Sequence, residues 1–573
     1  MSQLKPIATT PPSFKEMFTP KLVTALREGY KLPDLRADAI AGLTVAIVAL
    51  PLSMAIAIAS GVSPERGLYT AIVGGTLIST LGGSRFQIGG PAGAFIVLVA
   101  ATVARHGLEG LLIATFLAGL ILVTIGLLRL GTYVRFIPFP VTVGFTAGIA
   151  VIIFASQIKD LLGLTLSGPE PGALWPKLVA LSLALPTMNP GAVGIALITI
   201  GAIVTIRQLR PGWPALLIAV SIAAIIAALA HVPVETIGTR FGGIPRSLPA
   251  PHLPPLSLAG IMAVLPDAVS FALLGAIESL LSAVVADGMS GRRHRSNCEL
   301  VAQGIANMAS SCFGGICVTG TIARTATNVR AGAKSPISGI LHALFLLAFM
   351  LVAAPLASFI PLAALAGVLA TVAWSMAERH AFASLLRANW GDAAVLLSTF
   401  LLTIFVGLSE GIVVGFSLGA LLFLNRMAQT ISVETHASLI PADQADKLFE
   451  NQPSDAVAAA RDAVIYRIRG AFFFGSAASV GALLDRVPAR ARTFVLDFST
   501  VPLVDSTGTQ ILKSFAKTVN GRGAALFISA TRPDVRHTLI ENGLKPPLVR
   551  YSASIEAALA ASKAEPIANT KVT

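Results

Sequence analysis

The sequence predicts a polytopic α-helical membrane protein followed by a small α/β domain. Of the 573 residues, 54% are hydrophobic and only 12% are charged, a far smaller charged share than in a soluble domain. Up to about Ala428, windows of about 18 or more nearly uncharged residues recur, and each is long enough to cross a bilayer. After Met427 the composition becomes charged and mixed, which is typical of a soluble domain.

Hydrophobic segments predict fourteen membrane spans, of which two are half-spans. They cover residues 38–60, 66–84, 90–104, 108–128, 134–158, 173–206 (long or broken), 212–231, 260–287, 296–313, 320–332, 335–354, 358–378, 391–408 and 411–428. The proline-rich stretch from His231 to Ser257 fits no span, so it links two halves of seven spans. Because seven is odd, the second half is inverted relative to the first, as in many secondary transporters.

These segments divide the chain into four predicted parts. Residues 1–37 form a cytoplasmic lead-in without the apolar segment of a signal peptide, and residues 38–430 form the transmembrane transport domain. Residues 431–562 form the small α/β domain, and residues 563–573 are a disordered tail.

Basic residues orient the spans. With the N-terminus inside, twelve basic residues fall in the inner connections and six in the outer ones. The densest cluster, from Arg292 to Arg295, falls inside. By the positive-inside rule both termini are cytoplasmic, and we expect a multi-pass protein of the bacterial inner membrane.

Two glycine-rich breaks interrupt apolar segments, one in each half of the membrane region. The first is Gly89-Gly90-Pro91-Ala92-Gly93, and the second runs from Gly314-Gly315 to Val318-Thr319-Gly320-Thr321, roughly 225 residues later. A break exposes the free N–H groups of a half-helix, which attract an anion. Arg324, one turn into the second half-helix, would add positive charge. Its alternative interpretation is a snorkelling or cytoplasmic arginine.

Glu278 is the only acid deep in the eighth span. A carboxylate inside a membrane is costly and marks function, so Glu278 is a candidate for binding and releasing a proton. The alternative is a carboxylate paired permanently with a basic residue. Ser282 lies one turn further along the same helical face.

The C-terminal region alternates strands and helices. Residues 464–468, 493–498 and 524–529 read as strands, and residues 507–520 have helical spacing. This alternation predicts a small α/β domain.

Several function classes find no support in the sequence. The formal net charge of +13 is explained by the basic inner ends of spans, so no nucleic-acid partner is expected. Cys298, Cys312 and Cys317 fit no metal or redox spacing. With no nucleophile–base pair and no metal cluster, we expect neither an enzyme nor a bound metal or cofactor.

The motifs together resemble the SulP family of anion transporters, which includes prestin, pendrin and the cyanobacterial bicarbonate transporters. Pro51-Leu52-Ser53-Met54-Ala55 in the first span and the Gly89–Ala94 break look like family motifs. Glu299–Asn307 and Arg324–Asn328 are similar to the family's central block. Val495–Phe498 followed by Asp505-Ser506-Thr507-Gly508 resembles a STAS domain, and the likeness covers nearly the whole chain.

The resemblance implies a seven-plus-seven inverted repeat in which a core domain moves against a gate domain, carrying the anion in an elevator-like step. It also implies a homodimer with cytoplasmic STAS domains, which can bind a further protein. The anion would lie between the half-helices of spans 3 and 10, with Ser53 and Ser282 in support. The implied binding residues are Gly90, Ala92, Gly93, Ala94, Thr321, Ile322, Ala323 and Arg324. Ser506 matches the serine phosphorylated in anti-anti-sigma STAS proteins, which makes it a candidate regulatory phosphosite.

Two positions depart from sodium-coupled family members. In the sodium-coupled bicarbonate transporters that this chain resembles, an aspartate stands at the position of Glu278 and a threonine at the position of Ile322. A sodium site needs several oxygen ligands, and Ile322 offers none. The sequence therefore favours proton symport over sodium coupling, with uncoupled exchange as the alternative.

The expected function is secondary transport of a small oxyanion, with sulfate first and bicarbonate or a C4-dicarboxylate such as succinate next. A second hypothesis is a nucleobase permease of the same fold. Such permeases lack a STAS domain, and they usually carry an acid in the tenth span, where this chain has Arg324. A third is an anion-responsive sensor or scaffold whose STAS domain binds a partner.

Overall fold

The computed structural model describes residues 13–168, 170–210, 213–429, 431–434, 463–476, 480 and 491–564. The chain divides into two compact units, Met1–Phe416 and Ser417–Thr573. Most of the predicted lead-in is described, whereas residues 1–12 and the tail beyond residue 564 lie outside the described residues. The domain boundaries expected at residues 37, 430 and 562 stay predictions.

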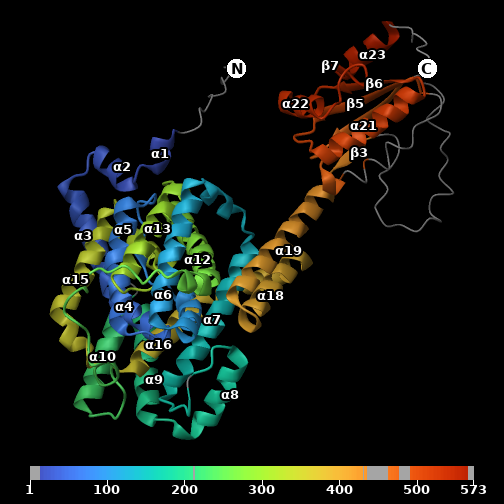
Figure 1. The fold of residues 1–573 in the computed structure, drawn as a ribbon. Coiled ribbons are helices and arrows are strands. Elements are labelled where there is room, and N and C mark those ends of the chain that lie inside the picture. The colour runs from blue at the N-terminus through green and yellow to red at the C-terminus, as the bar shows by residue number, and fades with distance from the viewer. Residues whose placement is uncertain are drawn as a thin grey trace. The chain divides into compact units, whose positions relative to one another are not determined.

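Helices build the first unit (Figure 1). Before the proline-rich link they are α1 (Phe14–Phe18), α2 (Lys21–Arg27), α3 (Leu32–Ala59), α4 (Pro64–Tyr69), the π-helical turn η1 (Thr70–Gly74), α5 (Gly75–Leu81), the 3-10 turn η2 (Gly93–Phe95), α6 (Ile96–Leu127), the 3-10 helix η3 (Leu130–Phe136), α7 (Phe139–Leu162), α8 (Leu174–Ala184), the 3-10 turn η4 (Leu185–Thr187), α9 (Pro190–Leu209) and α10 (Ala215–Leu229).

The link holds the short helix α11 (Ile237–Phe241), and a second series of helices follows it. These are α12 (Leu258–Ser290), α13 (Ser296–Cys312), α14 (Ile322–Arg330), α15 (Ile337–Ala357), α16 (Leu362–Met376), α17 (Arg379–Ala388), α18 (Trp390–Phe405) and α19 (Leu408–Gln429).

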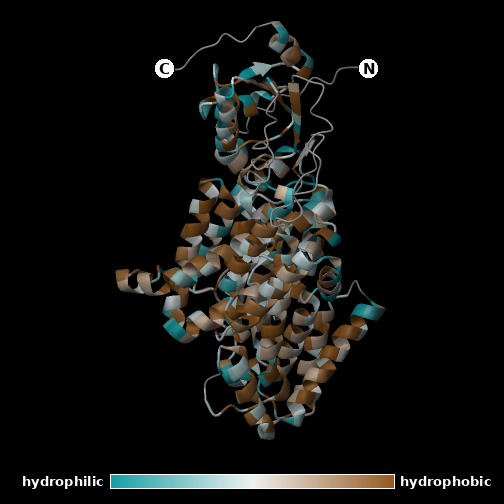
Figure 2. Ribbon diagram, turned by 90° about the vertical axis from the view of Figure 1, so that its right-hand side faces the viewer, coloured by the Kyte–Doolittle hydropathy of each residue, from teal (hydrophilic) through white to brown (hydrophobic). Residues whose placement is uncertain are grey.

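Among the described residues, eight helices are long and apolar enough to cross a membrane. They are Leu32–Ala59, Gly93–Leu127, Phe139–Leu162, Pro190–Leu209, Leu258–Ser290, Ile337–Ala357, Leu362–Ala388 and Glu410–Gln429. Three shorter apolar helices are Leu174–Thr187, Ala215–Leu229 and Trp390–Phe405. Hydrophobic residues dominate the long helices (Figure 2). A polytopic helical membrane protein is thereby confirmed, and the count of fourteen spans stays a prediction.

The structure shows where three of the predicted spans are interrupted. The segment predicted at residues 173–206, as long or broken, is broken: η4, which contains Pro186, separates α8 from α9, which begins at Pro190. The spans predicted at 90–104 and 108–128 are separated by a kink inside α6 at Gly107, which is non-helical with φ of 66°.

The helix α17 has no counterpart among the predicted spans. Residues 379–390 are expected only as a basic connection, yet Arg379–Ala388 form an amphipathic helix with no fully buried residue. Its mixed composition explains why a search for apolar segments passes over it.

The membrane helices pack in two groups. The first, called here the core group, consists of α3, α5, α6, α12, α13, α14 and α15, which pack on one another. The second, the gate group, consists of α7, α9, α10, α16 and α18. The helix α3 also contacts α10 and α16, so it joins the two groups.

Close helix packing in the core group depends on small residues. A methyl group built on Gly119 of α6 would lie 2.5 Å from the carbonyl oxygen of Gly304 in α13. A methyl group on Gly304 would lie equally close to the carbonyl oxygen of Gly119. Lipid gives apolar helices no hydrophobic reason to associate, so such backbone-to-backbone packing holds α6 and α13 together.

The second unit contains a five-stranded sheet in the order β3-β4-β5-β6-β7. Its strands are β3 (Ser432–Glu434), β4 (Ala463–Arg469), β5 (Thr493–Thr500), β6 (Ala525–Ser529) and β7 (Arg550–Ser552). Only β3 pairs antiparallel, and the remaining pairs are parallel. The helices within the described part of this unit are α21 (Ser506–Gly521), α22 (Pro533–Glu541) and α23 (Ile555–Ala564). The predicted α/β domain is confirmed.

Alternate residues of β5 face opposite sides of this sheet. Phe494 and Leu496 are buried with Phe515 of α21, whereas Val495 packs with Phe527 and with Ala558 of α23. Helices therefore cover both faces, which is why β5 reads as a continuous hydrophobic run.

We expect Gly119→Ala to destabilise the protein, because the added methyl group forces α6 and α13 apart at a cost of about 1–3 kcal/mol. The measurement is the thermal unfolding midpoint of the purified protein in detergent. The matched control is Gly194→Ala in α9, where an added Cβ meets no atom within 4 Å. Equal midpoints for the two variants would contradict the packing interpretation.

Candidate functional site

The two glycine-rich breaks meet in the folded chain. The strand β1 (Gly89–Gly90) pairs antiparallel with β2 (Thr319–Gly320), so that Gly89 lies opposite Gly320. The Thr321 N–H also donates to the Ile88 carbonyl at 3.1 Å. The breaks thus satisfy one another's backbone groups.

A helix begins directly after each strand. Ala92 is extended and is followed by η2, which continues into α6. Thr321 is extended and is followed by α14. Neither residue caps its helix with a side chain. The first N–H groups of both helices are therefore available for an anion.

Arg324 reaches from α14 to the first break. Its guanidinium donates from Nη2 to the Ser53 hydroxyl and to the Pro91 carbonyl, both at 3.2 Å. The residue is only 2% exposed, which argues against a surface or snorkelling arginine. Its Nε and Nη1 have no hydrogen-bond partner, and it forms no ion pair with any residue that the structure describes.

Gly90 makes room for this guanidinium. A Cβ atom on Gly90 would collide with Nη1 of Arg324. A buried cation with free donors is costly unless an anion compensates it. Among the described residues nothing satisfies Nε and Nη1, so these are the donors that an anion placed here would meet.

The other predicted binding residues lie on the same two segments. Gly90, Ala92, Ala94 and Thr321 are buried, Gly93 and Ile322 are half-buried, and Ala323 is exposed.

The helix α12 packs against the second break. The carbonyl of Gly275 accepts from the Thr319 hydroxyl at 3.2 Å, and the Ser282 hydroxyl donates to that of Thr325 at 3.0 Å. Glu278 lies between these positions and is 8% exposed. It forms no ion pair with a described residue, Arg324 included, so a permanent salt bridge finds no support.

Several polar residues at the breaks were missed by the sequence prediction. Asn307 of α13 accepts from the Val318 N–H at 3.0 Å and donates to the Val318 carbonyl at 2.8 Å. Gln87 donates to the Ser279 hydroxyl at 2.8 Å, and Thr325 accepts from the Ile88 N–H at 3.1 Å. The sequence did contain a signal for these residues, because amide side chains within apolar segments are costly and mark structural or functional positions. That signal does not say what each amide bonds.

His342 was missed as well. This histidine of α15 is fully buried, and both of its ring nitrogens lack a hydrogen-bond partner. Within the described residues no three His, Cys, Asp or Glu side chains lie together as a metal site, and the three cysteines are free.

In the second unit, Asp505 organises the loop before α21. Its carboxylate accepts from the Gly508 N–H at 2.7 Å and from the Phe474 N–H at 2.9 Å. Ser506, the first residue of α21, is exposed.

The interrupted apolar helices around a buried cation define a polytopic membrane transport protein. Residues 35–399 match the Sulfate permease family, and residues 456–558 match the STAS domain. The chain belongs to the sulfate permease family, a family of membrane anion transporters and not of enzymes.

Known proteins resemble the chain over most of its length. It is 40% identical to YvdB of Bacillus subtilis, named as a candidate sulfate transporter, over 90% of this chain and 95% of that one. It is 30% identical to the bicarbonate transporter BicA of Synechocystis sp., over 86% and 88% of the two chains. The structure of murine Solute Carrier 26 family member A9 superposes with a TM-score of 0.81 at 19% identity, covering 98% of this chain and 97% of that one. This last likeness shows the fold alone.

We expect Gly90→Ala to weaken anion binding about tenfold, because the added methyl group displaces the Arg324 guanidinium. The measurement is the anion-induced rise in thermal unfolding temperature of the purified protein. The control is Gly275→Ala, where an added Cβ has its nearest neighbours at 3.7 Å. If Gly90→Ala keeps the anion response of the control, Arg324 does not bind the anion in this position.

Proposed function

We propose that the protein is a secondary active transporter of a small inorganic oxyanion, with sulfate as the leading substrate. The observation that carries this proposal is the buried Arg324 guanidinium, with two free nitrogens, beside the paired breaks. The 40% identity to YvdB, a candidate sulfate transporter, supports sulfate. The 30% identity to a bicarbonate transporter keeps bicarbonate as the main alternative, followed by C4-dicarboxylates.

The anion binds between the N-termini of the half-helices of spans 3 and 10. Backbone N–H groups at Gly93, Ala94, Ile322 and Ala323 and the free donors of Arg324 are its ligands, and the helix dipoles favour its charge. Ser53 positions the Arg324 guanidinium through their hydrogen bond.

Transport is coupled to protons, with Glu278 as the carrier. Two observations support this: Glu278 is buried and forms no ion pair within the described part of the chain, and the Ile322 side chain offers no oxygen to sodium. An acid without a fixed partner can exchange a proton as the site opens to either side. Uncoupled anion exchange is the alternative.

Alternating access is an elevator-type movement of the core group against the gate group. Support comes from the packing, because both breaks, α12 and Arg324 belong to the core group while α7, α9, α10, α16 and α18 pack among themselves. The core group then carries the anion as one body. Fourteen spans in a seven-plus-seven inverted repeat complete this architecture.

The cellular setting follows from the charge distribution. The bias of basic connections supports cytoplasmic termini in a bacterial inner membrane, and family resemblance supports a homodimer. Phosphorylation of Ser506 is the proposed regulation, because that residue is exposed at a helix N-terminus, which favours a phosphate. An anion-responsive scaffold, with a protein bound to the STAS domain, is the alternative outside transport.

We expect sulfate to be taken up by proteoliposomes containing the protein and to be accelerated by an inward proton gradient, because symport moves both ions in one direction. Labelled sulfate measures the uptake. Uptake that ignores pH but needs sodium would refute proton coupling, and binding without flux would favour a scaffold.

We expect Glu278→Gln to abolish the dependence of uptake on the proton gradient, because glutamine cannot exchange a proton. Sulfate counterflow, which needs no net proton movement, should persist. The matched control is Glu109→Gln, the same change at an exposed residue of α6. Unchanged proton dependence in Glu278→Gln would remove Glu278 from this role.

We expect sulfate to raise the thermal unfolding temperature more than bicarbonate, succinate or chloride does, because binding to the folded state stabilises it by mass action. At a hundredfold excess over Kd the effect is about 2.7 kcal/mol. Arg324→Gln should remove it. A larger rise in unfolding temperature with bicarbonate would make bicarbonate, rather than sulfate, the leading substrate.

A further inference from the structure

The helix α17 lies between two exposed tryptophans of the kind found at a membrane–water interface. All four tryptophans of the chain, at positions 175, 213, 374 and 390, are 60–81% exposed and lie at or near the ends of apolar helices. Exposed tryptophans at helix ends mark the headgroup level of a bilayer. Trp374 and Trp390 flank α17 on both sides, so α17 lies along that level.

The two faces of α17 differ in chemistry. Phe382 packs edge to face on Phe400 of α18, with ring centroids 5.2 Å apart, and Leu385 is half-buried. His380, Ser384 and Arg387 recur at helical spacing and are exposed. A basic amphipathic helix of this kind lies in the plane of the interface with its polar face towards the headgroups.

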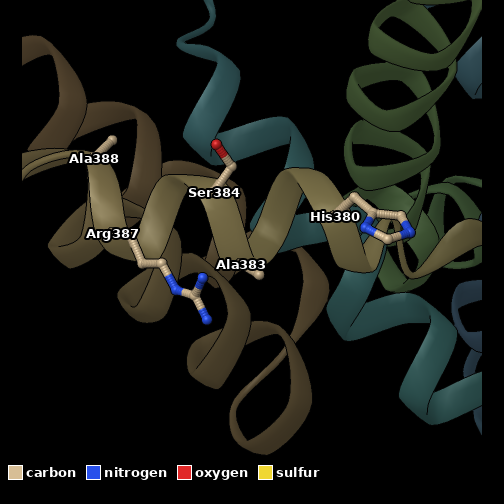
Figure 3. A pocket seen from close by; sticks show the side chains of 5 residues that line it. All are labelled: His380, Ala383, Ser384, Arg387 and Ala388. Carbon is tan, nitrogen blue, oxygen red and sulfur yellow. The ribbon is translucent and has the colours of Figure 1, made fainter.

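The polar face borders a hollow of about 520 Å³. We call it the α17 hollow, and its lining residues are His380, Ala383, Ser384, Arg387 and Ala388 (Figure 3). The polar side chains of these residues form no hydrogen bond or ion pair with any described residue. Arg379 lies at the start of the helix, with its guanidinium 4.0 Å from the centre of the Trp374 ring.

Charge favours an anion in this hollow. Arg379, His380 and Arg387 are basic, and the acids closest in sequence are Glu378 and Asp392. The Asp392 carboxylate accepts from the side-chain amide of the α18 N-cap residue Asn389, and the Asp392 N–H donates to the Asn389 side-chain oxygen. Among the five residues that line the hollow, Arg387 and His380 are basic and none is acidic, so the lining favours an anion.

We propose that the α17 hollow binds the phosphate headgroup of an anionic phospholipid. The Arg387 guanidinium offers the paired donors that match phosphate oxygens. The flanking tryptophans hold the hollow at the depth where lipid phosphates lie, which favours a lipid over a dissolved anion. This site is separate from the buried cation of the transport site.

The test is a lipid titration of the purified full-length protein in detergent, followed by native mass spectrometry. Phosphatidylglycerol is the anionic probe and phosphatidylcholine the zwitterionic one. Each arginine contributes about fivefold, so the double variant Arg379→Gln/Arg387→Gln should bind phosphatidylglycerol about 25-fold more weakly. Arg387→Lys should retain more affinity than Arg387→Gln, because its charge is kept.

The matched control is Arg246→Gln, which removes an exposed arginine of the proline-rich link. It should leave lipid affinity unchanged. Unaltered phosphatidylglycerol binding in the double variant, or an equal loss in Arg246→Gln, would overturn the proposal. Displacement of the lipid by inorganic phosphate at matched concentration would also overturn it, since the hollow would then be a site for dissolved anions. Failure of sulfate transport would not bear on these results.

Discussion

The pairing of β1 with β2 is the constraint on which the rest of the membrane region depends. A helix broken inside a bilayer leaves backbone groups that lipid cannot satisfy. Here each break satisfies the other: Gly89 lies opposite Gly320, and the Thr321 N–H donates to the Ile88 carbonyl. A side chain satisfies further backbone groups of the second break, because Asn307 donates to the Val318 carbonyl and accepts from the Val318 N–H. Two interruptions that would each be costly alone become one stable structure that exposes two helix N-termini.

That pairing also sets the direction of Arg324. Because α14 begins at the second break, its first turn places the guanidinium across Gly90 and onto Ser53 and Pro91. The protein satisfies one nitrogen of this buried cation and leaves Nε and Nη1 free. A buried charge held in this way is unfavourable for stability unless a partner compensates it, and this cost is what the proposed anion would offset.

The helix α13 links packing to the site. Gly304 lets α13 approach α6, the helix that continues from the first break, and Asn307, less than one turn further on, holds the second break. Both breaks are thereby fixed to one set of tightly packed backbones. Such rigidity suits a site that moves as a body, since its ligand geometry is kept while its surroundings change. The C-terminal sheet has its own hydrophobic core, so its folding rests on separate contacts.

The sequence alone determined the apolar helices, the positions of both breaks, the α/β character of the second unit and the choice of Arg324 and Glu278, because hydropathy, glycine and isolated charge are local signals. It did not determine that β1 and β2 pair, that Arg324 bonds Ser53, or that Glu278 forms no ion pair with the residues that the structure describes. It also passed over α17, whose amphipathic residues resemble a polar connection. These features depend on contacts between segments far apart in the chain, and only the tertiary structure decides which distant groups satisfy one another.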